Sequence, residues 1–138
     1  MEREIIKDIN VLTQKSEKFI FGEDDHLIQD MIDTANAHKE NCAGLACIQI
    51  GVPKKLILVK SNDKFIPFIN PTIIKRSTQT FMATERCLSL DGERNVKRHK
   101  QIKLAYTTKD GKTKVQEYSG FMAQVIQHEC DHLNGVLI

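Results

Sequence analysis

The sequence lacks the segments that direct a chain into or across a membrane. None of its apolar runs approaches the roughly 20 consecutive residues of a membrane-spanning helix. The first residues, Met1-Glu2-Arg3-Glu4, carry acidic side chains where a transit peptide avoids them, and no apolar signal-peptide core follows. We therefore expect a cytoplasmic protein.

Internal repeats, low-complexity tracts and an excess of one charge are missing as well. Twenty Lys and Arg against 18 Asp and Glu give a net charge of +2, and the basic residues are scattered except for the run Lys97–Lys100. We interpret that run as a solvated strand edge, and expect no membrane partner and no specific nucleic-acid partner. At 138 residues with 41% hydrophobic side chains, the chain predicts one globular domain over residues 1–138.

Cysteine is scarce, at four residues: Cys42, Cys47, Cys87 and Cys130. Four cysteines can form two disulfides in an oxidising compartment. Because no secretion signal precedes them, a reducing compartment is the better expectation. We predict free thiols or metal ligands.

The clearest chemical motif is Gln127-His128-Glu129-Cys130-Asp131-His132. On an α-helix His128 and His132 share a face, while Glu129 lies about 100° round, beside the site. This geometry suits a divalent metal that activates water, with Glu129 as its general base. The alternative is two core or surface histidines that flank an acid by chance.

The residues around the motif favour a buried helix. Apolar residues recur there at helical spacing, and they are Ala123, Ile126, Cys130 and Leu133. Ser119 is a suitable N-cap, and Asn134-Gly135 is a stop signal.

Upstream, the sequence predicts an amphipathic helix over 24–39, with Asp24 or Asp25 as its cap, followed by a buried strand over 42–51. Alternation on that strand places Gln49 on the same face as Leu45 and Cys47. A buried amide needs a partner, which is either the backbone or a substrate.

Further strands are expected over 56–59, 65–74, 84–90, 102–106 and 115–118. Pro67 and Pro71 make the second of these an edge or irregular strand, and Asp91-Gly92 is expected to turn the chain. We predict an α+β fold of antiparallel strands around a central helix that bears the HExxH motif, with the N-terminal helix packed alongside.

A catalytic metal site needs a third protein ligand. The six residues after His132 contain no histidine and no acid, so the ligand must come from upstream. Cys42 and Cys47 lie in the small-residue strand, and Cys130 falls on the far side of the helix. Cys87 remains, but spacing alone does not decide among the upstream cysteines.

Three segments together resemble the motifs of the peptide deformylases, in the order of that family. They are 44–49 (Gly-Leu-Ala-Cys-Ile-Gln), 85–89 (Glu-Arg-Cys-Leu-Ser) and 127–133 (Gln-His-Glu-Cys-Asp-His-Leu). The resemblance covers nearly the whole chain and implies a bacterial enzyme that removes the formyl group from the formyl-methionine of nascent chains. It also implies a transient contact with the ribosome.

The resemblance implies a role for individual residues. Cys87, His128 and His132 are the implied metal ligands, for Fe(II) above all, with Zn, Ni or Co able to replace it. Glu129 is the implied general acid and base, and Gln49 with the Leu88 backbone N–H holds the formyl oxygen. The substrate-binding residues that we expect are Ala43, Gly44, Arg86 and Val125.

The chain departs from the family pattern at three positions. Cys42 and Arg86 stand where the family has glycine, and Cys47 stands where it has alanine. The longer C-terminal helix of many members is also absent. Two alternatives follow: a deformylase-like protein that has drifted to low or altered activity, and an unrelated HExxH metalloprotease.

Overall fold

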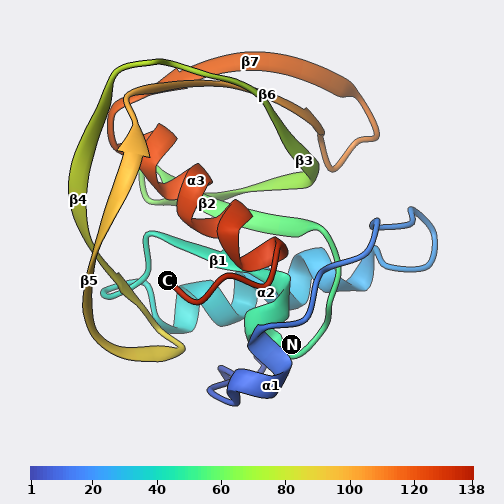
Figure 1. The fold of residues 1–138 in the computed structure, drawn as a ribbon. Helices are drawn as coiled ribbons and strands as arrows, with labels where there is room; N and C mark the ends of the chain where they lie inside the picture. The colour runs from blue at the N-terminus through green and yellow to red at the C-terminus, as the bar shows by residue number, and fades with distance from the viewer.

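The computed structural model describes all of residues 1–138 and contains helices and two antiparallel sheets (Figure 1). The helices are α1 (Ile9–Leu12), α2 (His26–Ala37) and α3 (Gly120–Leu133), with a 3-10 helix, η1, over Cys47–Ile50. The strands are β1 (Gly44–Ala46), β2 (Leu56–Ser61), β3 (Lys64–Arg76), β4 (Thr80–Cys87), β5 (Leu90–His99), β6 (Gln101–Thr107) and β7 (Thr113–Ser119). The predicted combination of helices with antiparallel strands is confirmed.

The larger sheet has the strand order β1-β2-β3-β6-β7, and β4 pairs with β5 in a separate two-stranded sheet. The motif helix is α3, the C-terminal helix, and it packs against β1 and β2 (Figure 1). Ser119 occupies its N-cap position and Asn134 its C-cap position, as the sequence predicts, although the Ser119 side chain makes no capping hydrogen bond.

Helices α2 and α3 cover opposite faces of the larger sheet. Ile57 and Val59 of β2 join a core cluster with residues of α3 such as Ile126. Their neighbours Leu56 and Leu58 join a second cluster with residues of α2, among them Leu27, Met31 and Ala35. The N-terminal helix thus packs alongside the sheet, on the face opposite the motif helix. Strand β2 is apolar on both faces because it separates the two helices.

Strand β3 is irregular, as predicted, but it is not an edge strand, because it pairs with β2 on one side and β6 on the other. Its pairing with β6 starts at Ile69, so Pro67 lies where only β2 is a neighbour. Pro71 falls at a register shift between Ile69 and Thr72. Both prolines thus occupy places where a missing N–H costs no regular ladder bond.

Two local predictions also need correction. The segment 42–51 forms only the short strand β1 before it turns into η1, which ends at Gly51 in the left-handed conformation, with φ of 88°. Asp91-Gly92 does not form the turn after the cysteine strand. Instead the chain turns at Leu88-Ser89, and Cys87 pairs with Leu90.

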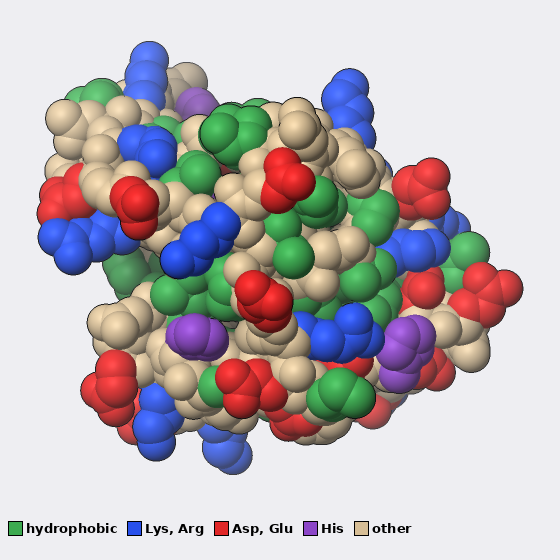
Figure 2. Space-filling view, turned by 90° about the horizontal axis from the view of Figure 1, so that it is seen from below, with side chains coloured by type: hydrophobic (Ala, Val, Ile, Leu, Met, Phe, Trp, Pro, Cys, Tyr) green, Lys and Arg blue, Asp and Glu red, His purple; other side chains and the backbone are tan.

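The exposed surface mixes charges of both signs. On the face seen in Figure 2, acidic and basic side chains alternate around a band of apolar ones, with no large area of one charge. No helix of the structure has the length and apolar character that crossing a membrane requires.

Candidate metal centre

Three side chains converge at the point where α3 meets the end of β4. The ligand atoms of Cys87, His128 and His132 all lie within 4.8 Å of one another. The Cys87 Sγ is 3.4 Å from the His132 Nε2, which is 3.2 Å from the His128 Nε2. One turn of helix places the two imidazoles on one face, and the strand end supplies the thiol.

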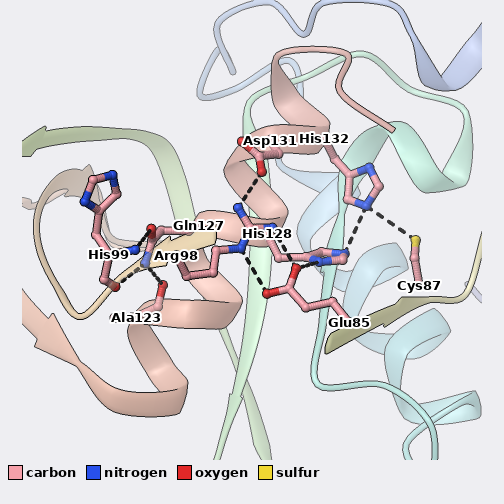
Figure 3. A network of polar contacts seen from close by, with 9 residues as sticks. All are labelled: Glu85, Cys87, Arg98, His99, Ala123, Gln127, His128, Asp131 and His132. Carbon is pink, nitrogen blue, oxygen red and sulfur yellow. Dashed lines mark hydrogen bonds and ion pairs between the residues drawn. The ribbon is translucent and has the colours of Figure 1, made fainter. Parts of the chain in front are cut away.

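A buried ion-pair network fixes the orientation of His128 (Figure 3). The His128 Nδ1 lies 2.8 Å from the Glu85 carboxylate, which leaves Nε2 directed toward the cluster. Arg98 donates to both oxygens of Glu85, at 2.7 and 2.9 Å, and to Asp131 at 2.6 Å. Such an outer partner selects the histidine tautomer and raises the basicity of a ligand.

The interpretation of 97–100 as a solvated strand edge is wrong for Arg98. Its side chain is only 5% exposed, because β5 directs it inward between Glu85 and the motif helix. The next residue, His99, is held to the helix as well: its backbone N–H and C=O both bond to the Gln127 side chain, at 2.9 Å each. Sequence reasoning gave no role to Glu85, Arg98, Gln127 or Asp131.

Burial and neighbouring charges strongly shift the pKa values at the centre. Burial raises the pKa of Glu129 to about 7, although His128 opposes the shift. Burial and then His128 lower the pKa of His132 to about 3. Burial also lowers the pKa of His128, but Cys87 and Glu85 outweigh it and raise that pKa to about 10. Without metal, these pKa shifts favour a charged His128 beside a neutral His132 at neutral pH, and a metal must displace the extra proton of His128.

The centre fits a metal ion on the chemistry of its donors. Two imidazole nitrogens and a thiol point at one position, a set that suits zinc and the first-row transition metals. Glu129 is 3% exposed, and its buried Oε1 has no hydrogen-bond partner in the protein. Glu129 lines the same cleft as Cys87 and His128, and its unpartnered oxygen needs a hydrogen-bond donor that the chain does not supply.

Gln49 reaches this centre from η1. Its Oε1 accepts a hydrogen bond from the Ala46 N–H at 2.9 Å, which closes the 3-10 turn. Its Nε2 donates to the Cys87 Sγ at 3.3 Å and to the Ser89 Oγ at 3.2 Å. The prediction that this buried amide needs a partner is confirmed: the backbone of Ala46 and the side chains of Cys87 and Ser89 all bond to it.

A cleft of about 470 Å³ opens onto the centre. Its lining includes nine of the ten residues that the sequence nominated as ligands, catalytic groups or substrate-binding groups, namely Ala43, Gly44, Gln49, Arg86, Cys87, Leu88, Val125, His128 and Glu129. The tenth, His132, is fully buried behind them. Cys42 also lines the cleft, whereas Cys47 and Cys130 do not, and all four cysteines are free thiols.

Arg86 lies at the exposed rim of the cleft, where the sequence analysis placed it among the substrate-binding residues. Its side chain is 79% exposed and forms an ion pair with Glu93 across the β4–β5 hairpin. In the pairing of the two strands, Asp91, Gly92 and Glu93 all lie opposite this one residue, because the register shifts between Glu85 and Cys87.

Gly44 allows β1 to approach the motif helix closely. A Cβ atom at this position would lie 2.7 Å from the Val125 Cγ1, 2.8 Å from the Glu129 Oε2 and 2.9 Å from the Leu58 carbonyl oxygen. The carbonyl belongs to the sheet and cannot move aside, so Gly44→Ala should displace Glu129. We expect kcat to fall by about 10²-fold with metal content unchanged. An unchanged kcat would mean that the carboxylate position is not critical.

Replacing Glu85 by glutamine should weaken metal binding. The change removes the negative charge that Arg98 and His128 share and replaces one of the two acceptor oxygens by an NH2 group facing donors, so metal affinity should fall about 10–100-fold. The free energy of unfolding should fall by about 3–5 kcal/mol.

Glu93→Gln is the matched control, because it makes the same chemical change in an exposed ion pair, which is worth about 0–1 kcal/mol. Metal titration and denaturant unfolding of both variants provide the test. Equal losses in the two would contradict the role of the buried network.

An α+β fold in which a helix-borne HExxH motif and a strand cysteine surround one position defines a candidate metallohydrolase. A family model described as polypeptide deformylase matches residues 3–138. The chain belongs to the peptide deformylase family.

Individual relatives agree. A peptide deformylase of Clostridium beijerinckii is 41% identical over 138 residues, which is the full length of both chains. One from Campylobacter jejuni is 41% identical over 80% of this chain and 67% of its own length. The crystal structure of a Thermotoga maritima peptide deformylase has a TM-score of 0.88 at 31% identity and covers 99% of this chain and 94% of its own.

Structures of a class I type b peptide deformylase from Acinetobacter baumannii are also similar. The actinonin-bound form has a TM-score of 0.90 at 29% identity and covers 99% of this chain and 95% of its own. A form bound to Met-Ala-Ser has a TM-score of 0.89 at 26% identity, over 99% of this chain and 97% of its own.

Proposed function

We propose that this enzyme removes the formyl group from the N-terminal formyl-methionine of newly synthesised polypeptides. The observation that carries the proposal is the convergence of Cys87, His128 and His132 beside the buried carboxylate of Glu129, where the cleft begins. Membership of the family and the peptide bound to the Acinetobacter relative support it.

We propose that Cys87, His128 and His132 hold one divalent metal ion. When bound, the ion supplies Lewis-acid chemistry, which lowers the pKa of water and polarises the formyl carbonyl. The donor set accepts Fe(II), Zn, Ni or Co. We propose Fe(II) as the working metal, in keeping with the family resemblance.

Glu129 is the proposed general acid and base. Its carboxylate takes the proton of the attacking water and passes it to the leaving amine, a role that suits a pKa of about 7. Burial without a hydrogen-bond partner on Oε1 keeps this carboxylate available for the proton.

Gln49 and the Leu88 backbone N–H are the proposed donors to the formyl oxygen as negative charge develops on it. The two donor hydrogens of the Gln49 amide are directed at Cys87 and Ser89 in the free enzyme. A substrate oxygen therefore has to replace one of these acceptors. Ala43, Gly44, Val125 and Arg86 line the proposed path of the peptide.

The test is turnover of formyl-Met-Ala-Ser by anaerobically purified protein whose metal has been identified by elemental analysis. Acetyl-Met-Ala-Ser is the matched control, because it adds only a methyl group. We expect hydrolysis of the formyl peptide with a stoichiometric metal. Cleavage of internal peptide bonds would instead favour the metalloprotease alternative, and metal-loaded protein with no turnover would favour the drifted relative.

We also propose that residues 1–138 act as one catalytic domain with α3 as its central element, because residues of both sheets surround the motif. The enzyme would then work in the bacterial cytoplasm on nascent chains and contact the ribosome only transiently.

A further inference from the structure

The outer part of the cleft carries cationic side chains from three separate segments of the chain. They are Lys39, which follows α2, Lys60 of β2 and Arg86 of β4. A peptide whose formyl group lies at Cys87 must leave the enzyme through the open part of this cleft. The charges of these three residues therefore meet the part of the peptide that follows its first residue.

The Lys60 ammonium has hydrogen-bond and aromatic contacts but no carboxylate partner. Its ammonium lies 6.0 Å from the centre of the Phe65 ring and donates to the Lys39 backbone carbonyl at 3.0 Å. It makes no ion pair with a carboxylate, so two of its three donor hydrogens are left for a ligand.

Arg86 also keeps donors for a ligand. Its Nε and Nη2 both bond to one oxygen of Glu93, and its Nη1 has no partner. Because the side chain is mostly exposed, this ion pair is weak, and the guanidinium can turn to another carboxylate at little cost.

The acidic residues in and around the cleft cancel these charges only in part. Glu85 is buried and paired with Arg98, and Glu129 is buried behind the metal position. Glu40 is the only carboxylate of the outer lining, and it makes no ion pair. Three cations thus face two exposed acids, Glu40 and the Glu93 that pairs with Arg86, so one net positive charge remains in the part of the cleft that a peptide crosses.

We propose that the enzyme prefers formyl peptides that carry an acidic side chain directly after the first residue, with Lys60 and Arg86 as the specificity-determining residues. The preference rests on the proposed deformylase function and defines its substrate class. A carboxylate at that place gains charge-assisted hydrogen bonds, whereas a lysine there meets like charges. Arg86, which stands where the family pattern has glycine, adds a charge to this path.

The test compares kcat/KM for formyl-Met-Glu-Ser and formyl-Met-Lys-Ser, with formyl-Met-Ala-Ser as the neutral reference. At low salt the glutamate peptide should be about three- to tenfold better than the lysine peptide. The ratio should approach one at about 1 M salt, where the screening length is about 3 Å. Arg86→Gln and Lys60→Met should each lower the ratio, and the double variant should abolish it.

Lys112→Met is the control, because it removes the same charge from the exposed β6–β7 turn and should leave the ratio unchanged. A ratio of one in the parent enzyme, or a ratio that survives in the double variant, overturns the proposal. The dissociation constants of Met-Glu-Ser and Met-Lys-Ser, measured by calorimetry on the metal-loaded protein, test the charge preference separately from the deformylase function. If Met-Glu-Ser binds more tightly than Met-Lys-Ser but no formyl peptide is hydrolysed, the preference for acidic peptides stands and the proposed deformylase activity is refuted.

Discussion

Glu129→Ala is expected to bind metal as the parent enzyme does and to lose most of its activity. Glu129 is not one of the three convergent ligands, but its buried carboxylate lines the same cleft as Cys87 and His128. Removal of a general acid and base typically lowers kcat by about 10²–10⁴-fold. Elemental analysis together with formyl-peptide kinetics on the same preparation measures both effects.

Glu129→Gln refines this experiment, because the amide preserves the volume of the buried side chain and cannot accept the proton. If the loss of activity comes from proton transfer, the alanine and glutamine variants should be similarly impaired. Turnover near the parent rate in either metal-loaded variant would refute the assignment of Glu129.

Cys87→Ala should have the second large effect, which is loss of the metal itself. The substitution removes one of three converging donors, and the loss of a mere outer partner of a ligand already costs about 10–100-fold in affinity. We therefore expect a larger loss of affinity, with little metal left after gel filtration and activity lost in proportion.

Cys47→Ala is the comparison for this variant. Cys47 is fully buried on the side of the sheet that faces α2, away from the ligands. Its variant should retain metal even if it unfolds more easily. Unchanged metal in Cys87→Ala would show that another cysteine, such as Cys42 in the cleft, supplies the third donor.

The sequence predicted best those features that depend on neighbours within one turn or strand. The spacing of His128 and His132 determines their common face on any helix, so the structure could only agree once the helix formed. Cys87 could not be identified in this way, because sequence spacing did not determine which cysteine is the third ligand. The resemblance to the family identified it instead. The structure brings its sulfur to the two imidazoles from 45 and 41 positions away in the chain.

The errors arose where distant parts of the chain determine the environment of a residue. Arg98 lies in a basic run and looks solvated, but its partners are 13 and 33 positions away, and they enclose it. Likewise, the apolar segment 42–51 resembles a strand. It becomes a 3-10 turn after Ala46 because the Gln49 amide bonds back to the backbone, which periodicity does not reveal.

The separation of β4 and β5 from the larger sheet has a consequence for the lifetime of the protein in the cell. The hairpin shares no backbone ladder with that sheet, and side-chain contacts hold it to the helix that carries both histidines. Near its tip, Cys87 faces the same helix. A metal held between them stabilises the closed state by mass action, by about 2.7 kcal/mol at a hundred times the dissociation constant. When metal is scarce, only the side-chain contacts hold the hairpin, so we expect it to open more often and to expose its backbone to proteases. The supply of metal would therefore control how much of this enzyme a cell retains, in addition to how fast each molecule works.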